Sequence, residues 1–183
     1  ETYPYKVYES NLDPILRFMH RTKIQSTGWI DTGDNCILNN LCKTDIDIFC
    51  NRWADLKPSE NNEMAPFIVA SFDIEANSST GKFPDPEIHG DCVFQIAITL
   101  KRLGNDEIYD KTCLCYKTTN SIEGNNIISY PTEYELLMGF KKYLEQMDID
   151  IMTGWNIFGF DLEFIYKRAL LAGCPSEFFE LSK

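Results

Sequence analysis

The sequence lacks the long apolar run that a membrane-spanning helix needs, since no stretch of about 18 apolar residues occurs in it. Its first ten residues, ETYPYKVYES, contain no apolar segment of the kind found in signal peptides. We therefore expect an intracellular protein that is not secreted and has no membrane partner. The chain does not begin with Met, and we expect an excised fragment or a processed product.

Basic residues are too few to balance the acids. The chain has 17 Lys and Arg against 28 Asp and Glu, which gives a net charge of −11 at pH 7. This balance argues against a protein that holds nucleic acid mainly by neutralising phosphates with basic side chains. It does not exclude a protein that meets phosphates through metal ions bound to carboxylates. The hydrophobic fraction of 44% and the length of 183 residues predict one or two globular domains.

Zinc-site spacing is missing as well. The seven cysteines include no C-x-x-C pair, and His20 and His89 lie far apart in the sequence. Cys113 and Cys115 lie two residues apart in a strand-like segment, so a soft-metal site is one interpretation of them. Reduced thiols of an intracellular protein are the interpretation that we favour.

A polar stretch with two prolines, KPSENNEMAP at residues 57–66, is the clearest boundary in the chain. We expect an N-terminal domain of mixed α+β type over residues 1–66 and a second domain over residues 67–183. In the first, Asp13 followed by Pro14 predicts the start of a short helix. Trp29 and Ile30 predict the start of a strand.

The second segment alternates between strand and helix patterns. Strands are predicted at residues 67–76, 92–100, 111–118 and 150–153. A T-x-x-E capping box at Thr132 and Glu135 predicts one helix, and residues 161–172 before Gly173 predict another. In the last predicted helix, one stripe of side chains is expected to face the core. It consists of Leu162, Ile165, Tyr166, Ala169 and Leu170. The order β-β-β-α-β-α predicts an α/β fold, with a mixed sheet and flanking helices.

Asp73 and Glu75 end the first of these strands. Residues two apart in a strand project from the same face, so the two carboxylates stand side by side. A hard cation such as Mg²⁺ would relieve their repulsion. From this pair alone, the exit of the strand into solvent is the favoured interpretation.

The second candidate segment is GWNIFGFD at residues 154–161, between a predicted strand and a predicted helix. Asp161 is placed either to cap the helix or to bring a third carboxylate to the edge of the sheet. Asn156 is either a turn residue or a donor to a substrate. We expect Trp155 and Phe158 to be buried, and stacking on unpaired bases is the alternative.

These two segments resemble a known pair of motifs. SFDIEA at 71–76 and TGWNIFGFD at 153–161 are similar to the first and second exonuclease motifs of family B DNA polymerases, D-x-E and N-x-x-x-[FY]-D. Further stretches resemble the delta-type branch, which includes the polymerases of large DNA viruses. They are YESNLDPILRFM at 8–19, GWI at 28–30, GKFPDPE at 81–87 and VFQIA at 93–97.

The resemblance implies a ribonuclease-H-like 3′–5′ exonuclease domain, preceded by part of a polymerase N-terminal domain. It implies that Asp73, Glu75 and Asp161 are catalytic metal ligands and that Asn156 and Phe160 lie on the substrate side. Two Mg²⁺ or Mn²⁺ ions would activate water to remove a mismatched 3′ nucleotide. The implied partners are DNA, as a single-stranded 3′ end or a primer–template, the rest of the polymerase chain and a processivity factor. The implied location is the nucleus or a cytoplasmic site of viral replication.

One motif of the family is missing. No Tyr in the chain is followed by Asp four residues later, as the third motif Tyr-x-x-x-Asp requires. We therefore expect a fragment that ends before this motif and is inactive alone. The alternative is a non-catalytic nucleic-acid-binding or scaffolding module of the same fold, with binding through the weakly basic residues 1–30 and Trp29. A free-standing nuclease would need a complete ligand set, which the sequence does not contain.

Overall fold

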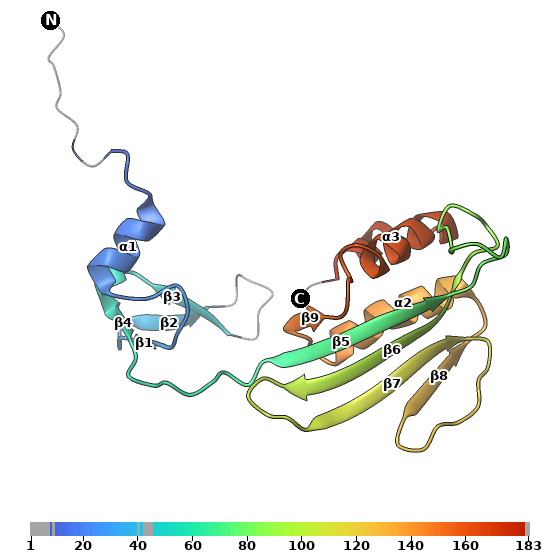
Figure 1. Ribbon diagram of the computed structural model, residues 1–183. Coiled ribbons are helices and arrows are strands. Elements are labelled where there is room, and N and C mark those ends of the chain that lie inside the picture. The colour runs from blue at the N-terminus through green and yellow to red at the C-terminus, as the bar shows by residue number, and fades with distance from the viewer. Residues whose placement is uncertain (1–7, 9, 40, 42–45, 182–183) are drawn as a thin grey trace, which may run out of the picture. The chain divides into compact units, whose positions relative to one another are not determined.

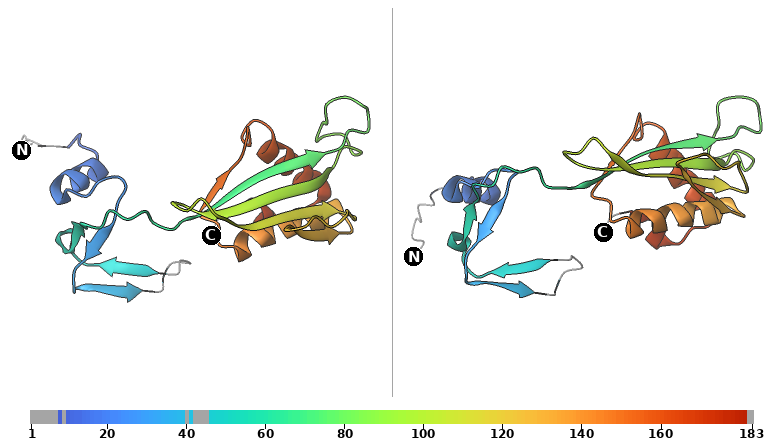
Figure 2. Two further views of the ribbon diagram at one scale, coloured as in Figure 1. Left: turned by 60° about the horizontal axis from the view of Figure 1, so that its bottom comes forward. Right: turned by 90° about the horizontal axis from the view of Figure 1, so that it is seen from below.

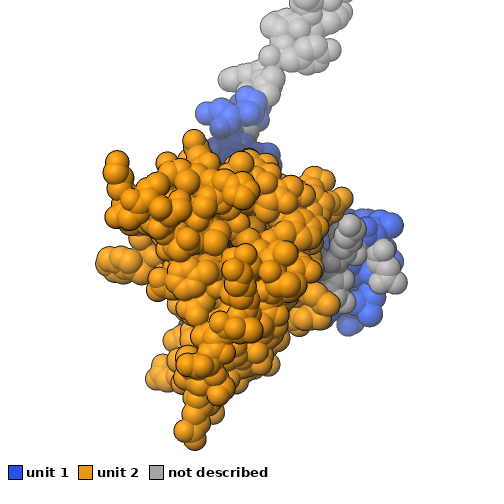
Figure 3. Space-filling model, turned by 90° about the vertical axis from the view of Figure 1, so that its right-hand side faces the viewer, with its two compact units in different colours: residues 1–63 blue, residues 64–183 orange. Residues whose placement is uncertain are grey.

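The chain divides into two compact units, residues 1–63 and residues 64–183, which Figure 3 shows in separate colours. The computed structural model describes Tyr8, residues 10–39, Leu41 and residues 46–181. Glu9, within the 8–19 stretch compared above, and Cys42 lie outside the described residues. We call residues 1–63 unit 1 and residues 64–183 unit 2.

Unit 1 consists of a short helix and two small sheets. Helix α1 (Pro14–Thr22) begins as predicted, because an Asp13 side-chain oxygen accepts hydrogen bonds from the backbone N–H groups of Ile15 and Leu16. The strands are β1 (Ile30–Thr32), β2 (Cys36–Asn39), β3 (Asp47–Cys50) and β4 (Leu56–Pro58), with the 3₁₀ turn η1 (Trp53–Asp55) before β4. β1 pairs with β4 and β2 with β3, both antiparallel. The predicted strand start near Ile30 is confirmed.

Unit 2 is built on one five-stranded sheet in the order β8-β7-β6-β5-β9 (Figure 1). Its strands are β5 (Ile68–Ala76), β6 (Val93–Arg102), β7 (Ile108–Tyr116), β8 (Asn126–Tyr130) and β9 (Ile151–Thr153). β5, β6 and β7 are antiparallel neighbours, whereas β8 and β9 pair in parallel with β7 and β5. The predicted mixed sheet is confirmed, but the prediction missed β8.

Two helices cover one face of this sheet (Figure 2). They are α2 (Glu133–Gln146) and α3 (Asp161–Ala172), followed by the 3₁₀ turn η2 (Ser176–Phe179). The capping box is formed, because the Thr132 hydroxyl accepts from the Glu135 N–H and donates to the Glu135 carboxylate. α3 ends at Gly173, whose φ of 72° lies in the left-handed region. Among the described residues, no helix is long and apolar enough to cross a membrane.

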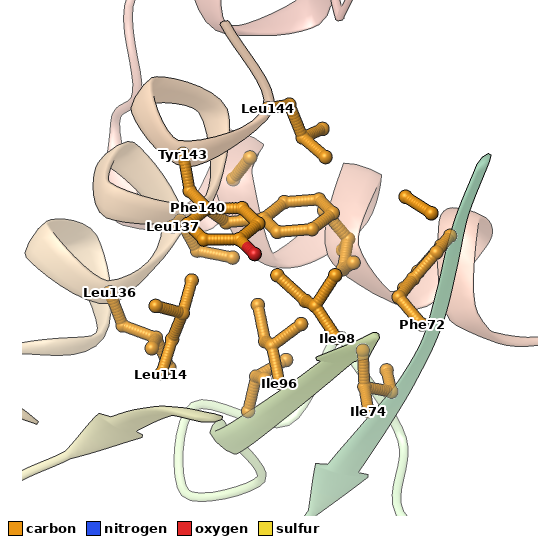
Figure 4. Close-up of a cluster of buried hydrophobic side chains, with 14 of the residues drawn as sticks. Phe72, Ile74, Ile96, Ile98, Leu114, Leu136, Leu137, Phe140, Tyr143 and Leu144 are labelled. Carbon is orange, nitrogen blue, oxygen red and sulfur yellow. The ribbon is translucent and has the colours of Figure 1, made fainter. Parts of the chain in front are cut away.

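The core lies between this sheet face and the two helices. Strand side chains at alternate positions meet the inner face of α2, as Figure 4 shows for Phe72, Ile96, Ile98 and Phe140 among others. Phe72 and Phe140 lie with ring centroids 5.5 Å apart. The opposite face of the sheet bears Ser71, Asp73, Glu75 and Ala97, which are exposed, and we call it the open face.

The core-facing stripe of α3 differs from the expected one. The buried side chains are Asp161, Phe164, Ile165, Arg168 and Ala169, whereas Tyr166 and Leu170 are more than half exposed. Compared with the prediction, the helix is rotated so that Phe164 and Arg168 face the core. Arg168 can be buried because it donates hydrogen bonds to Glu133, a partner that the sequence pattern does not indicate.

Candidate active site

The candidate site lies at one edge of the sheet, where β5 and β9 end. These strands run parallel, so their carboxyl ends point the same way; β9 ends at Thr153, opposite Ser71, and β5 continues to Ala76. Gly154 follows directly, and a side chain at this position would overlap the carbonyl oxygen of Phe72 and the side chain of Ile157. The close approach of the two backbones therefore requires glycine here.

Asp161 is fixed at this edge by a backbone hydrogen bond. Its carboxylate is buried, with 2% of its surface exposed, and its Oδ1 accepts from the N–H of Ile74 at 3.0 Å. β9 pairs with β5 only as far as Ser71, so it does not reach the N–H of Ile74. The first residue of α3 thus satisfies a backbone donor that the short strand leaves unpaired.

Asp161 and Asp73 lie close enough to affect each other electrostatically. Burial raises the pKa of Asp161 above the ordinary aspartate value, and the neighbouring Asp73 carboxylate adds to the rise. The hydrogen bond from Ile74 opposes the rise because it stabilises the ionised form. The structure therefore brings together a first-motif and a second-motif carboxylate that are 88 positions apart in the chain.

Glu75 shares the open face with Asp73, as the sequence predicted. Both side chains are exposed, whereas Phe72, which precedes them, and Ile74, which lies between them, are buried. Among the residues that the structure describes, however, no three His, Cys, Asp or Glu side chains converge as a ready metal group. Asp73 and Glu75 share the open face, but Glu75 does not complete a three-ligand cluster with Asp73 and the buried Asp161.

Asn156 shapes the loop between β9 and α3. Its φ of 54° lies in the left-handed region, which Asn tolerates better than most residues. Its carbonyl accepts from the N–H groups of Gly159 and Phe160, at 2.9 and 3.0 Å. A side chain at Gly159 would overlap the Asn156 side-chain oxygen. Of the two roles considered for Asn156, the turn role is the one with contacts in the structure.

Trp155 and Phe158 are exposed, so the expectation that they are buried is wrong. Their exposed fractions are 90% and 85%. Ile157, between them, takes the buried position with 3% exposed and packs in the core cluster. Of the three apolar side chains at positions 155, 157 and 158, only Ile157 points inward, and the sequence does not indicate which one would.

Phe160 packs beside the site on two other rings. Its centroid lies 5.3 Å from that of Phe83 and 5.4 Å from that of the buried Phe164. Phe83 is 76% exposed and belongs to the loop between β5 and β6, so Phe160 connects this loop to α3. The sequence placed Phe160 at the site but gave no signal for this contact.

A buried ion pair between Arg168 and Glu133 contacts the same loop between β5 and β6. The Nε and Nη2 of Arg168 donate to the Glu133 carboxylate, at 2.9 and 2.6 Å, and its Nη1 donates to the carbonyls of Pro86 and Ile88. Glu133 in turn accepts from the N–H of Val93, where β6 begins. The sequence analysis did not predict this pair. Arg168 lies on the same face of α3 as Phe164 and Ile165, and this spacing was a signal that Arg168 is buried.

Asp91 organises the loop internally. It is fully buried and accepts from the N–H and hydroxyl of Ser79 and from the N–H of Asp85. The Ser79 hydroxyl and these backbone donors lower the pKa of Asp91 below its ordinary value. The loop that carries Phe83 is therefore anchored at several points.

Comparisons with known proteins point to one family. A model of the exonuclease domain of DNA polymerase family B matches residues 5–175. A DNA polymerase of Acanthamoeba polyphaga mimivirus is 40% identical over 169 residues, which cover 91% of this chain and 10% of the relative. A DNA polymerase of Paramecium bursaria Chlorella virus NY2A is 33% identical, covering 91% and 18%. The DNA polymerase delta catalytic subunit of Oryza sativa subsp. japonica is 30% identical, covering 90% and 15%.

Proposed function

The chain belongs to the family B DNA polymerases, within their exonuclease domain, and on this premise we propose that it contributes a 3′–5′ proofreading site. The chain spans 10% to 18% of the length of the relatives compared above. Its proposed substrate is the single-stranded 3′ end of DNA, and its proposed partner is the rest of a polymerase chain. A processivity factor is expected from the resemblance alone.

The observation that carries the proposal is the pairing of Asp73 with Asp161. Two carboxylates from distant motifs lie close together, and burial, with a smaller contribution from the Asp73 carboxylate, raises the pKa of Asp161. Such a pair is best satisfied by a divalent cation, and Glu75 offers a further carboxylate on the same face. We propose these three residues as the metal ligands, with Mg²⁺ or Mn²⁺ as the ions.

The residues of the chain have separate tasks in this proposal. Ile74 orients Asp161 through its backbone N–H, and Asp73 presents an exposed carboxylate to solvent and substrate. The chemistry that divalent cations supply in such sites is the activation of water and the neutralisation of phosphate charge. Asn156 and Phe160 are proposed on the substrate side, where Phe160 lies between the Phe83 loop and α3.

The finer fold assignment belongs to the same proposal. The order β8-β7-β6-β5-β9, with three antiparallel strands before α2 and a parallel β9 after it, supports a ribonuclease-H-like domain over residues 67–183. Residues 1–66 are proposed as part of the polymerase N-terminal domain.

Metal binding tests the proposed ligands directly. We expect calorimetric titration with Mn²⁺ to give a binding heat that is lost in the Asp73→Ala/Glu75→Ala variant. A matched control, Asp106→Ala/Glu107→Ala, removes the same charge from an exposed loop and should keep the heat. Equal heats in all three proteins would refute the ligand assignment and favour a non-catalytic nucleic-acid-binding module.

Hydrolysis of a labelled single-stranded oligonucleotide tests the activity. The chain contains no Tyr-x-x-x-Asp, so we expect weak or no hydrolysis by it and clear 3′–5′ hydrolysis by a longer polypeptide that includes such a motif. Asp73→Ala/Glu75→Ala should abolish the activity of the longer protein. Metal-dependent hydrolysis that survives this double substitution would contradict the proposed site.

A further inference from the structure

Two cysteines of unit 1, Cys36 and Cys50, lie directly opposite each other on neighbouring strands. β2 pairs with β3 in antiparallel register, and the two cysteines face each other at the end of the pair that is remote from the connecting loop (Figure 1). Both are free thiols, and both are half-buried. They lie on unit 1, whereas the proposed metal ligands lie on unit 2, so their chemistry is independent of the proposed function.

The strand register brings the two cysteines within the reach of a disulfide. Directly opposite residues of an antiparallel pair have Cα atoms about 4.5–5.5 Å apart, and disulfides join residues whose Cα atoms lie about 4.4–6.8 Å apart. The two thiols already contact each other, because a hydrogen bond with Cys36 is the main interaction that raises the pKa of Cys50 to about 11. Closing the S–S bond therefore requires no change of strand register.

Backbone hydrogen bonds fix the chain on both sides of the cysteine pair. Before β2, the Cys36 N–H donates to the carbonyl of Gly33 at 3.0 Å, and the Gly33 N–H donates to the carbonyl of Asp55 at 2.7 Å. After β3, the Asp55 N–H donates to the carbonyl of Arg52 at 3.0 Å. Gly33 thus links the segment before β2 to the segment after β3, at the same end of the hairpin as the two cysteines.

A second pair of thiols shows that close sulfur atoms alone do not make such a site. The Sγ atoms of Cys113 and Cys115 lie 3.5 Å apart, but both residues belong to the single strand β7. Residues two apart in one strand have Cα atoms about 6.6–6.8 Å apart, which is the upper limit for a disulfide. Cys115 is also buried, with 1% of its surface exposed, so an oxidant reaches it less easily than Cys36 or Cys50.

We propose that Cys36 and Cys50 form a reversible oxidation site, which a hydroperoxide converts to a disulfide that joins β2 to β3. Hydrogen peroxide oxidises one thiol to a sulfenic acid and is itself reduced to water. The sulfur of the other thiol then attacks the sulfenic sulfur, so that the S–S bond forms and the S–O bond breaks. The hydroxyl group leaves with the proton of the second thiol as another molecule of water. Each sulfur gives up one electron, and the peroxide accepts both.

The disulfide supplies a restraint that unit 1 otherwise lacks. Among the described residues of this unit, Ile24 is the only buried apolar side chain, and both of its sheets have two strands. Hairpins of this kind are marginally stable by themselves, and a cross-link between residues 36 and 50 restricts the unfolded chain. In a reducing compartment such a pair rests as thiols and is oxidised transiently. Oxidation should therefore make the hairpin open less often.

Peptide mapping of the full chain by mass spectrometry tests the cross-link. After exposure to hydrogen peroxide, the remaining thiols are capped with N-ethylmaleimide, and trypsin then cuts after Lys43 and Arg52. These cuts place Cys36 and Cys50 on separate peptides. We expect the two peptides to be joined by a disulfide in the oxidised chain and separate after treatment with dithiothreitol.

Three variants identify the thiols that are joined. The linked peptides should disappear in Cys36→Ser and persist in Cys42→Ser, which removes the other thiol on the Cys36 peptide. They should also persist in the matched control Cys113→Ser/Cys115→Ser. Linkage through Cys42, or a disulfide between two copies of the chain, would overturn the assignment. So would full capping of both Cys36 and Cys50 after a peroxide treatment that oxidises free glutathione completely.

Limited digestion with chymotrypsin tests the effect on the hairpin. Phe49 lies in β3 beside Cys50, so cleavage after Phe49 requires the hairpin to open. Peroxide treatment should slow this cleavage about tenfold in the unchanged chain. It should leave the rate unchanged in Cys36→Ser/Cys50→Ser, which cannot form the bond. Equal rates before and after the disulfide has formed would refute the stabilising role of the oxidation site.

Discussion

The two units of the chain differ most in how much apolar surface each one buries. Unit 2 packs Phe140, Phe164 and Phe178, with many aliphatic side chains, into one core in which most of them have less than 5% of their surface exposed. Among the described residues of unit 1, the only buried apolar side chain is Ile24. Unit 1 instead exposes large apolar side chains along β2 and β3, such as Leu38 at 78%.

This difference shows which unit can account for its own stability. A sheet with helices on one face removes enough apolar area from water to offset the entropy of ordering the chain. Two separate two-stranded sheets do not, because isolated hairpins are marginally stable at best. The site residues Asp73, Glu75 and Asp161 all lie on unit 2, so the candidate chemistry is built on the well-packed unit.

Separating the two units should give the largest difference between them in thermal unfolding. We expect residues 64–183 alone to unfold in one cooperative thermal transition, and residues 1–63 alone to show none, because only unit 2 contains a core. Circular dichroism during heating measures both. A cooperative transition in residues 1–63 would show that its described contacts understate its stability.

Removing one phenylalanine from each unit compares them at the level of single side chains. Phe140→Ala empties a fully buried position and should lower the free energy of unfolding by about 3–5 kcal/mol. Phe49→Ala, at a position 49% exposed in β3, should change it by about 0.5 kcal/mol or less. Urea unfolding followed by circular dichroism gives both values. Equal losses would mean that Phe49 is covered by something outside the contacts described.

The two units also contain ion pairs of different kinds. Arg168 and Glu133 have side chains that are 6% and 12% exposed, so Arg168→Met leaves a buried carboxylate unpaired and should cost about 3 kcal/mol of stability. The Arg52 side chain of the Arg52–Asp55 pair is 67% exposed, and Arg52→Met should cost much less. Both are measured by urea unfolding.

A double substitution separates the charge from the packing. Arg168→Met combined with Glu133→Leu removes both charges, so it should recover most of the stability lost in Arg168→Met alone. If the double variant is no more stable than the single one, the hydrogen bonds to the backbone groups of Pro86, Ile88 and Val93 matter more than the charge pair. In that case the two ion pairs would differ mainly in the hydrogen bonds that they make, and less in the burial of their charges.

The features that the sequence predicted well depend on neighbours in the chain. The capping box at Thr132, the cap at Asp13 and the shared face of Asp73 and Glu75 all follow from spacings of two or three residues. The nearness of Asp161 to Asp73 was implied by the resemblance to a family, because no local pattern relates residues so far apart.

The features that it missed depend on partners distant in the chain. β8 is a five-residue strand whose pairing requires β7, and its local pattern does not separate it from a loop. The inward face of α3 is decided by Glu133, which receives Arg168 into the core. The exposure of Trp155 is decided by Ile157, which takes the buried position in the loop.

The smallest expected effect concerns two carboxylates that are stabilised in different ways. In unit 1 the Arg52 guanidinium lowers the pKa of Asp55, and in unit 2 the hydroxyl and backbone donors of Ser79, with the N–H of Asp85, lower that of Asp91. A lowered folded-state pKa contributes stability above the unfolded value of about 3.9, and this contribution is lost as the pH falls through the folded-state pKa. Both carboxylates should therefore stabilise their units at neutral pH and lose that effect in acid.

Substitution by Asn should reveal the difference. Asp91→Asn retains one acceptor oxygen where the carboxylate used two, so it should lower the melting temperature at neutral pH, and the gap to the unchanged chain should close below about pH 4. High salt should leave the Asp91→Asn gap intact, because hydrogen bonds to a buried carboxylate are poorly screened. The gap for Asp55→Asn should shrink in high salt, because its partner Arg52 is mostly exposed. If high salt reduced both differences in melting temperature equally, the anchoring of the Phe83 loop by Asp91 would be mainly an effect of charge. The two units would then stabilise their buried carboxylates in the same way.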